Sequence, residues 1–285
     1  MKTQPSAKVI ADSVNVDGDR LITIEATMHR FVLSEFNTHR VFSRNSASSR
    51  AIPVKKQLEK IQKDPALPIE YGTNKRGMQA GESLKGLFAG QANYHWLKAR
   101  DAAYIASERI SGDLNVHKQV ANRILEPWMW HTVIFSATEF DNFFEQRCSP
   151  LAQPEICDIA NKIRSSIKYS TPNHLGEGDW HLPYIQDDEN DLDLETKKMV
   201  SAARCARVSY LTHDGVKDID KDIELYDRLI NANPPHWSPL EHVATPDISN
   251  KVFLKSGEKV FPVSVIGNFV GWRQLRHDIQ GVEFV

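Results

Sequence analysis

The sequence predicts an α+β fold in which a mixed or antiparallel sheet is flanked by long helices. Three observations support this class: an alternating segment near the start of the chain, long stretches of helical periodicity in its middle, and short strand-like segments near its end. With 285 residues, of which 41% are hydrophobic and 25% charged, the chain can bury one large core or two modest ones.

The first elements are a strand and a helix in direct succession. Residues 21–26 alternate between two sets of side chains, as a half-buried strand does. Helical spacing then predicts a helix over residues 29–39, with its apolar face formed by Phe31, Val32, Phe36 and His39.

The middle of the chain is predicted to be mainly helical. Residues 62–90 contain two prolines and five glycines, which favours a flexible lid. Helical periodicity then runs over residues 91–124, with a break where Asp113 or Asn115 would cap a new helix. The apolar and aromatic segment 129–148 is predicted to be a buried helix, and a further helix begins near Pro154.

A polar, acidic connection over residues 170–196 is the best candidate for a boundary within the chain. We therefore predict a first part over 1–169, a linker over 170–196 and a second part over 197–285. The second part contains two helical stretches, a proline-rich turn over 233–243 and two strand-like segments. Residues 30–40 and 268–278 share a Phe-Val pair, a spacer and a basic residue beside a histidine, which indicates an internal repeat.

Charge and cysteine content exclude several classes of function. The net charge is -2, so no overall field draws the chain to a nucleic acid polymer or a membrane surface. The three cysteines fit no disulfide or zinc framework, and the six-residue spacing of His236 and His242 is poor for zinc, so we expect no metal. With no apolar leader or span in the sequence, we expect a cytoplasmic protein.

Cations and hydroxyls are concentrated in "FNTHRVFSRNSASSRAIP", residues 36–53, which contains no acidic residue. Arginine donors fit phosphate oxygens, and serine hydroxyls with loop amides can complete the shell of an oxyanion. The stretch therefore indicates a phosphate or diphosphate site. A solvated surface loop open to phosphorylation is an alternative, and nucleic-acid binding is a third, weakened by the slightly acidic chain.

Three blocks of the sequence resemble the flavin-dependent thymidylate synthases. The family signature is Arg-His-Arg, seven residues, then Ser, and here Thr38-His39-Arg40 is followed by seven residues and Ser48. The second block spans 120–155 and carries Arg123, Asn142, Arg147, Gln153 and Glu155. The third spans 202–243 and carries Ser209, His236, Ser238, Glu241 and His242.

The order of these blocks differs from that of the family. There the third block precedes the signature, whereas here it follows. The chain thus resembles a permuted, divergent member with the signature helix present twice, at 30–40 and at 268–278. The resemblance implies the fold of that family and a homotetramer with active sites between subunits, and the second copy of the helix would also be compatible with a dimer.

The resemblance implies transfer of a one-carbon unit from methylenetetrahydrofolate to carbon 5 of a pyrimidine deoxynucleoside monophosphate, with dUMP converted to dTMP. FAD and NADPH would supply the reduction. Substrate contacts would come from Glu35, Ser48, Ser49, Arg50, Arg123 and Arg147. Flavin contacts would come from His39, Arg40, Asn45, Asn142, Ser209, Ser238, Glu241, Arg276 and His277. Arg147, beside the base carbonyl, and His236, toward the folate, would be the catalytic residues.

Several positions depart from the family pattern. Thr38 replaces the first signature arginine and Glu35 replaces a glutamine. Family residues that contact the flavin are replaced by Ser136, Thr138 and Leu151, which places FAD affinity in doubt. Two alternatives therefore stand beside thymidylate synthesis: a phage enzyme that hydroxymethylates dUMP or dCMP, and a non-catalytic nucleotide-binding homologue.

Overall fold

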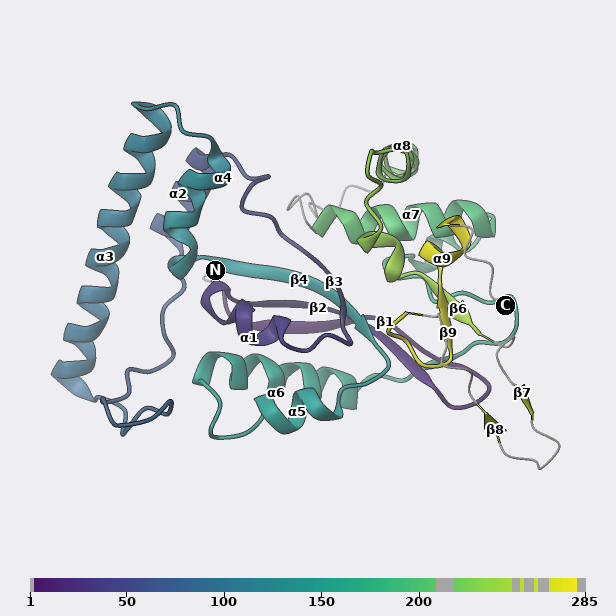
Figure 1. The fold of residues 1–285 in the computed structure, drawn as a ribbon, viewed down its shortest axis with the longest axis horizontal. Helices are drawn as coiled ribbons and strands as arrows, with labels where there is room; N and C mark the ends of the chain where they lie inside the picture. Colours follow the sequence, from purple (N-terminus) through teal and green to yellow (C-terminus); the bar gives the residue numbers. More distant parts are fainter. Residues whose placement is uncertain (1–2, 209–217, 248–251, 254–258, 261–266, 281–285) are drawn as a thin grey trace.

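A five-stranded mixed sheet forms the centre of the computed structural model, which describes residues 3–208, 218–247, 252–253, 259–260 and 267–280. The strand order is β3-β4-β2-β1-β5 (Figure 1). All neighbouring pairs are antiparallel except β1 and β5. The bounds are Ser6–Val14 for β1, Arg20–His29 for β2, Ser43–Ser46 for β3, Trp130–Ala137 for β4 and Asn173–His174 for β5.

Helices cover both faces and one end of this sheet (Figure 1). One face packs on α5 (Asp141–Arg147) and α6 (Pro154–Lys168), and the other lies toward α7 (Leu194–Arg207) and α8 (Ile219–Ile230). At one end stand α2 (Val54–Lys63), α3 (Gly86–Gly112) and α4 (Lys118–Ala121). The predicted α+β class, a mixed sheet flanked by long helices, is confirmed.

Short elements connect these layers. Between β2 and β3 the chain forms η1 (Arg30–Val32) and α1 (Leu33–Asn37), and η2 (Asn122–Trp128) leads into β4. The second half adds η3 (Asp187–Glu189), η5 (Ser238–Glu241) and α9 (Leu275–Gln280). Two small antiparallel pairs join β6 (Ala244–Pro246) to β9 (Trp272–Gln274) and β7 (Val252–Phe253) to β8 (Lys259–Val260).

The main core lies between the sheet and α6. Ile24 on β2 is opposite Phe135 on β4, and both pack with Ile156 and Ile163 of α6. Thr23, on the opposite side of β2, is also fully buried. The prediction of a half-buried strand is therefore wrong, because β2 is a central strand covered on both faces.

The predicted helix over 129–148 is wrong in its first half, where the chain forms β4. Val133 and Phe135 face the α6 core, whereas Ile134 packs with Cys205 of α7. Both faces of β4 are thus largely buried, so its side chains do not alternate between apolar and polar as those of a strand with one solvent face do. Only α5 is helical in this segment.

Two helix boundaries also differ from the prediction. The helix expected over 29–39 is a 3-10 turn followed by α1, although Val32, Phe36 and His39 are buried on one face as predicted. The helix break after α3 was placed correctly, but the capping residue of α4 is His117, whose side chain accepts from the backbone N–H of Gln119.

The two segments that share a sequence pattern are folded differently. Residues 30–40 form η1 and α1, whereas residues 268–278 form a turn, β9 and the start of α9. Of the strand-like segments predicted over 251–256 and 259–266, only β7 and β8 belong to the described residues. Within the described ranges, no helix has the length and apolar character needed to cross a bilayer.

Candidate functional site

Residues 35–50 carry seven of the sixteen predicted site residues and contact three groups of side chains. The helix cluster consists of Glu35, Thr38, His39 and Arg147. The strand cluster consists of Asn45, Ser238, Glu241 and Arg276. The loop cluster consists of Arg30, Ser48, Ser49, Arg50, Arg123 and Glu126.

The helix cluster forms around Arg147, the last residue of α5. Its Nε donates to Nε2 of His39 at 3.0 Å, and its Nη2 donates to Oγ1 of Thr38 at 2.9 Å and to the carbonyl oxygen of Glu35 at 3.3 Å. Burial, reinforced by the positive charges of Arg147 and Arg44, lowers the pKa of His39. The imidazole is therefore neutral and accepts from the guanidinium. Nη1 of Arg147 has no hydrogen bond within the described residues and can meet a ligand.

The loop cluster forms around Oε1 of Glu126, in η2. Arg123 Nη1 lies 2.7 Å from this oxygen, Arg30 Nη2 lies 3.1 Å away and the buried Ser49 hydroxyl lies 3.4 Å away. The Ser48 hydroxyl accepts from the backbone N–H of Arg50 at 3.3 Å. Cationic and hydroxyl donors thus converge on one anionic oxygen, as they would on a phosphate.

The strand cluster holds β3 against the second half of the chain. Asn45 Nδ2 donates to the carbonyl oxygen of Cys205 at 2.9 Å, and Ser238 Oγ lies 3.3 Å from Asn45 Oδ1. Arg276 Nη1 donates to Glu241 Oε1 at 2.5 Å. His277, next in α9, is buried. The four side chains of the strand cluster already bond to protein groups. Within one chain they therefore stabilise the contact of β3 with the second half of the chain and do not form an open flavin site.

The other predicted site residues lie apart from these contacts. The side chains of Arg40, Asn142 and His236 are exposed and have no hydrogen bond within the described ranges. Arg50 is exposed beside the loop cluster. Ser209 lies outside the described residues. The printed contacts of Arg147 lie in the helix cluster and those of Arg123 in the loop cluster, and no hydrogen bond or ion pair between described residues joins the two clusters.

A buried polar network occupies the face of the sheet toward α7. Thr23 Oγ1 lies 2.6 Å from Ser136 Oγ and 2.8 Å from His181 Nε2, and the Ser136 hydroxyl lies 2.8 Å from His242 Nδ1. Ser13 completes the row at 2.8 Å from His181 Nδ1. Burial lowers the pKa of both histidines to about 3, so both imidazoles are neutral. Ser136, which replaces a family residue at a flavin contact, is committed to this network.

Two residues of the loop cluster, Glu126 and Arg30, were not among the predicted site residues. Glu126 lies three residues after Arg123, a spacing at which side chains on a helical turn meet, so this pair was detectable. Arg30 was not detectable from the sequence, because its guanidinium comes close to Glu126 and His131 only in the folded chain. His131 is buried, and burial followed by the Arg30 charge lowers its pKa to about 3.

Cys148 follows Arg147 in the chain, and its free thiol is half-buried. Burial is the largest influence on it and raises its pKa. A raised pKa reduces the fraction of thiolate, which is the nucleophilic form. The structure therefore agrees with a passive thiol at this position.

The geometry defines an α+β protein with arginine and hydroxyl donors gathered along one segment. A family model described as thymidylate synthase complementing protein matches residues 21–173, more than half of the chain. The chain belongs to this family. The match includes the signature and the block around Arg147, while the third block lies beyond it.

Two solved structures have partial similarity to this chain. The UMP/dUMP methylase PolB from Streptomyces cacaoi, bound with 5-Br UMP, has 12% identity and a TM-score of 0.47 over 58% of this chain and 89% of that chain. The flavin-dependent thymidylate synthase ThyX from Helicobacter pylori, complexed with FAD and dUMP, has 15% identity and a TM-score of 0.36 over 52% and 67%. No curated protein matches the sequence.

Proposed function

We propose that the protein transfers a one-carbon unit from methylenetetrahydrofolate to carbon 5 of a pyrimidine deoxynucleoside monophosphate, with dUMP as substrate and dTMP as product. Family membership supports the reaction class. The observation that carries the assignment to this chain is the loop cluster, where Arg123, Arg30 and Ser49 converge on one anionic oxygen. A phosphomonoester has the charge and the acceptor oxygens to replace that carboxylate.

In this proposal Ser48, Ser49, Arg50 and Arg123 hold the phosphate, while Arg147 and Glu35 face the base. Arg147 is fixed by three hydrogen bonds and keeps Nη1 for the ring carbonyl. A fixed cation at that oxygen stabilises the negative charge that builds up on the ring as carbon 5 becomes nucleophilic. His236 is proposed on the folate side.

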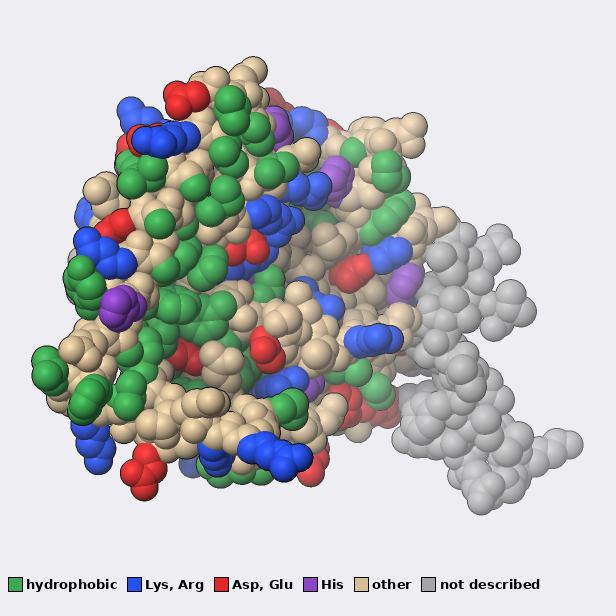
Figure 2. Space-filling model, turned by 60° about the vertical axis from the view of Figure 1, so that its left-hand side comes forward, with side chains coloured by type: hydrophobic (Ala, Val, Ile, Leu, Met, Phe, Trp, Pro, Cys, Tyr) green, Lys and Arg blue, Asp and Glu red, His purple; other side chains and the backbone are tan. Residues whose placement is uncertain are grey.

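The two halves of this site would come from different copies of the chain. No hydrogen bond or ion pair between described residues joins the helix and loop clusters, and in this proposal one molecule presents a phosphate half and a base half separately. The long helix α3 offers a surface for such assembly, because its side chains Leu87, Phe88, Tyr94 and Ile105 are exposed. Figure 2 shows hydrophobic side chains gathered on the side of the molecule that it brings forward. Burial of such side chains stabilises association. We therefore propose a homo-oligomer, a tetramer as the family resemblance implies.

The residues proposed to contact FAD do not form an open binding site within one chain. Asn45 and Ser238 bond to each other, Glu241 is neutralised by Arg276, and Ser136 belongs to the buried network. These contacts also support a second candidate, in which the transferred carbon is trapped by water as a 5-hydroxymethyl group instead of being reduced.

Mass spectrometry of the product is the test. The full chain is incubated with dUMP or dCMP, methylenetetrahydrofolate, FAD and NADPH, and we expect a methylated nucleotide from dUMP. A product that carries one additional oxygen would establish the second candidate. Absence of product and of binding with both nucleotides would overturn the proposal and leave a non-catalytic homologue.

Replacing Arg123 with alanine is expected to weaken dUMP binding by about 10- to 100-fold, because one charge-assisted hydrogen bond to the phosphate contributes roughly 1.5–3 kcal/mol. Titration calorimetry measures the change. Arg109→Ala, in the last turn of α3, is the matched control and should bind as the parent does. Equal affinities for the two variants would remove Arg123 from the phosphate site.

A further inference from the structure

His39 has a fixed place beside the guanidinium of Arg147. The residue follows α1 in the chain and is only 6% exposed. Its backbone carbonyl oxygen accepts from Arg44 Nη1 at 3.2 Å. The imidazole packs edge-on against Phe143 of α5, with ring centroids 4.9 Å apart, and Phe42 packs beside it at 5.9 Å. A ring held by its backbone and by two aromatic neighbours can orient the group to which it bonds.

The imidazole is one of three acceptors that orient Arg147. The guanidinium donates from Nε to Nε2 of His39, and from Nη2 to the Thr38 hydroxyl and the carbonyl oxygen of Glu35. Because Nε and Nη2 belong to one planar group, bonds at both atoms fix the direction in which Nη1 points. Without the bond to His39, the plane is held at one nitrogen only. Nη1, the donor proposed to meet the base carbonyl, would then lose its fixed direction.

Of these three acceptors, only the imidazole changes its charge between pH 5 and 8. Neutral His39 accepts at Nε2, so its proton is on Nδ1, whereas an imidazolium carries a proton on both nitrogens and cannot accept. Burial lowers the pKa of His39, and the charges of Arg147 from α5 and Arg44 from β3 lower it further. Glu241 of η5 acts on Arg44. Protonation therefore removes the bond to Nε and adds a third positive charge beside two others.

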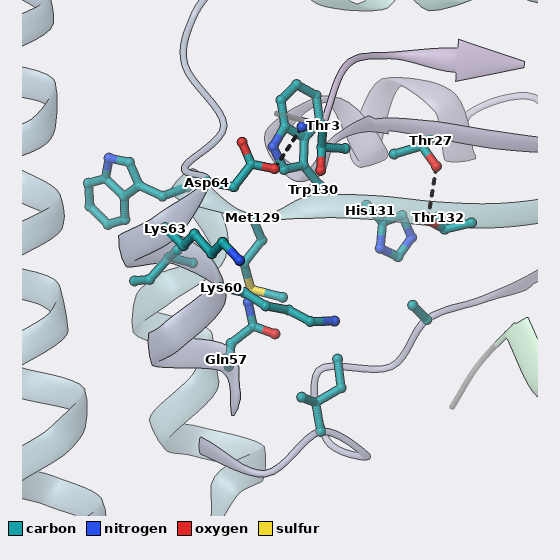
Figure 3. Close-up of a pocket in the computed structure, with 14 residues that line it drawn as sticks. Thr3, Thr27, Gln57, Lys60, Lys63, Asp64, Met129, Trp130, His131 and Thr132 are labelled. Carbon is teal, nitrogen blue, oxygen red and sulfur yellow. Dashed lines mark hydrogen bonds between the residues drawn. The ribbon is translucent and has the colours of Figure 1, made fainter. Parts of the chain in front are cut away.

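A second contact between an arginine and a histidine does not respond to pH in this range. Arg30 Nη1 lies 3.0 Å from Nδ1 of His131. With Gln57 of α2 and Thr132 of β4, His131 lines a pocket of about 280 Å³ (Figure 3). Burial, followed by the Arg30 charge, lowers the pKa of His131 to about 3, so this ring stays neutral between pH 5 and 8. His39 is less deeply buried, and its pKa is lowered less.

We propose that His39 is a positioning residue for Arg147, and that protonation of its ring releases the guanidinium from the direction needed at the base. The inference rests on the proposed function, since it concerns the arginine assigned to the base carbonyl. It gives His39 the role of orienting that arginine in place of a contact with the flavin. Because the pKa of the folded His39 is lowered, the reaction should slow only as the pH falls below the usual histidine value of about 6.5.

Nuclear magnetic resonance of the His39 side chain tests the pairing without turnover. In the parent protein we expect the proton on Nδ1 at neutral pH and a titration midpoint below about 6.5. Arg147→Met keeps most of the side-chain volume but removes the charge, and should raise the midpoint. Arg164→Ala, exposed on α6, is the control and should leave it unchanged. A proton on Nε2 in the parent, or one midpoint for both variants, would overturn the inference. This readout separates a failure of the pairing from a failure of the proposed reaction.

Steady-state kinetics with saturating FAD test the consequence for the reaction. His39→Gln keeps an acceptor that does not titrate, so it should retain most of the kcat at neutral pH and lose less of it in acid. His39→Leu has no acceptor and should lower kcat about tenfold with little change in the KM for nucleotide. His174→Gln, exposed on β5, is the matched control and should follow the parent at every pH.

Thermal melts at each pH separate this effect from acid destabilisation. His131, His181 and His242 are present in every variant, so the loss of stability that they cause is common to all. The inference is overturned by a His39→Leu protein with the kcat of the parent, or by a His39→Gln protein with the parent's pH profile. A defect that is seen only below saturating FAD would identify a flavin contact and overturn it as well.

Discussion

Replacing Arg147 with alanine is expected to lower the rate of carbon-5 modification by about 10²- to 10³-fold, the usual cost of removing one fixed donor from a developing negative charge. The guanidinium is held by His39, Thr38 and the carbonyl of Glu35, so it needs no reorganisation as charge develops on the ring. Steady-state kinetics with saturating dUMP measure the effect, which should appear in kcat more than in KM.

A matched variant separates this effect from damage to the fold. Arg164→Ala removes an exposed arginine of α6 whose guanidinium, among the described residues, bonds to Asn161, and it should leave the rate unchanged. Arg147 also joins α5 to α1, so thermal melts of both variants are required. Arg147→Lys restores the charge but not the bond geometry and should recover only part of the rate. An Arg147→Ala protein that melts like the parent and keeps more than a tenth of its rate would contradict the assigned role.

Lowering the pH from 8 to 5 is expected to reduce the free energy of unfolding by roughly 6 kcal/mol in total. His131, His181 and His242 are buried with pKa values of about 3, whereas an unfolded histidine has a pKa near 6.5. Between these values the unfolded chain binds protons that the folded chain does not, so stability falls as the pH falls through the unfolded pKa. At pH 5 each histidine contributes about 2 kcal/mol to the loss.

Urea titrations at pH 8 and pH 5 measure this loss. A domain of ordinary stability has about 5–15 kcal/mol, so the protein should be close to unfolding at pH 5. His242→Asn keeps an amide near the Ser136 hydroxyl but cannot titrate, and the difference between the two pH values should shrink by about 2 kcal/mol. Equal stability of the parent at both pH values would show that these imidazoles are not held neutral.

Local sequence signals were sufficient for elements with one solvent-facing side. The helices α6 and α8 have clear start signals, Pro154 at the first turn and Asp218 as an N-cap, and the start of α6 was predicted at its actual position. The strand β4 was mistaken for a helix because both of its faces are buried. Hydrophobic periodicity reflects which side chains face solvent, so a strand with both faces buried shows little periodicity.

The candidate site shows a similar limit. Motif spacing identified Arg123 and Arg147, but their contacts depend on pairs that no local pattern encodes. Arg147 meets His39 across 108 positions of the chain, and Thr23 meets His181 across 158. Gln57 sits in the apolar stripe of an amphipathic helix, and only the three-dimensional arrangement reveals the cavity that it faces.

Glu126 gives the loop cluster a resident counter-ion. An incoming anion therefore does not fill a bare cationic site: it must take over Arg123 and Ser49 from a carboxylate that already neutralises them. A neutral nucleoside has nothing to exchange for that carboxylate, whereas a phosphomonoester brings more charge than it displaces. The ion exchange itself would then discriminate nucleotide from nucleoside before any contact is made with the base.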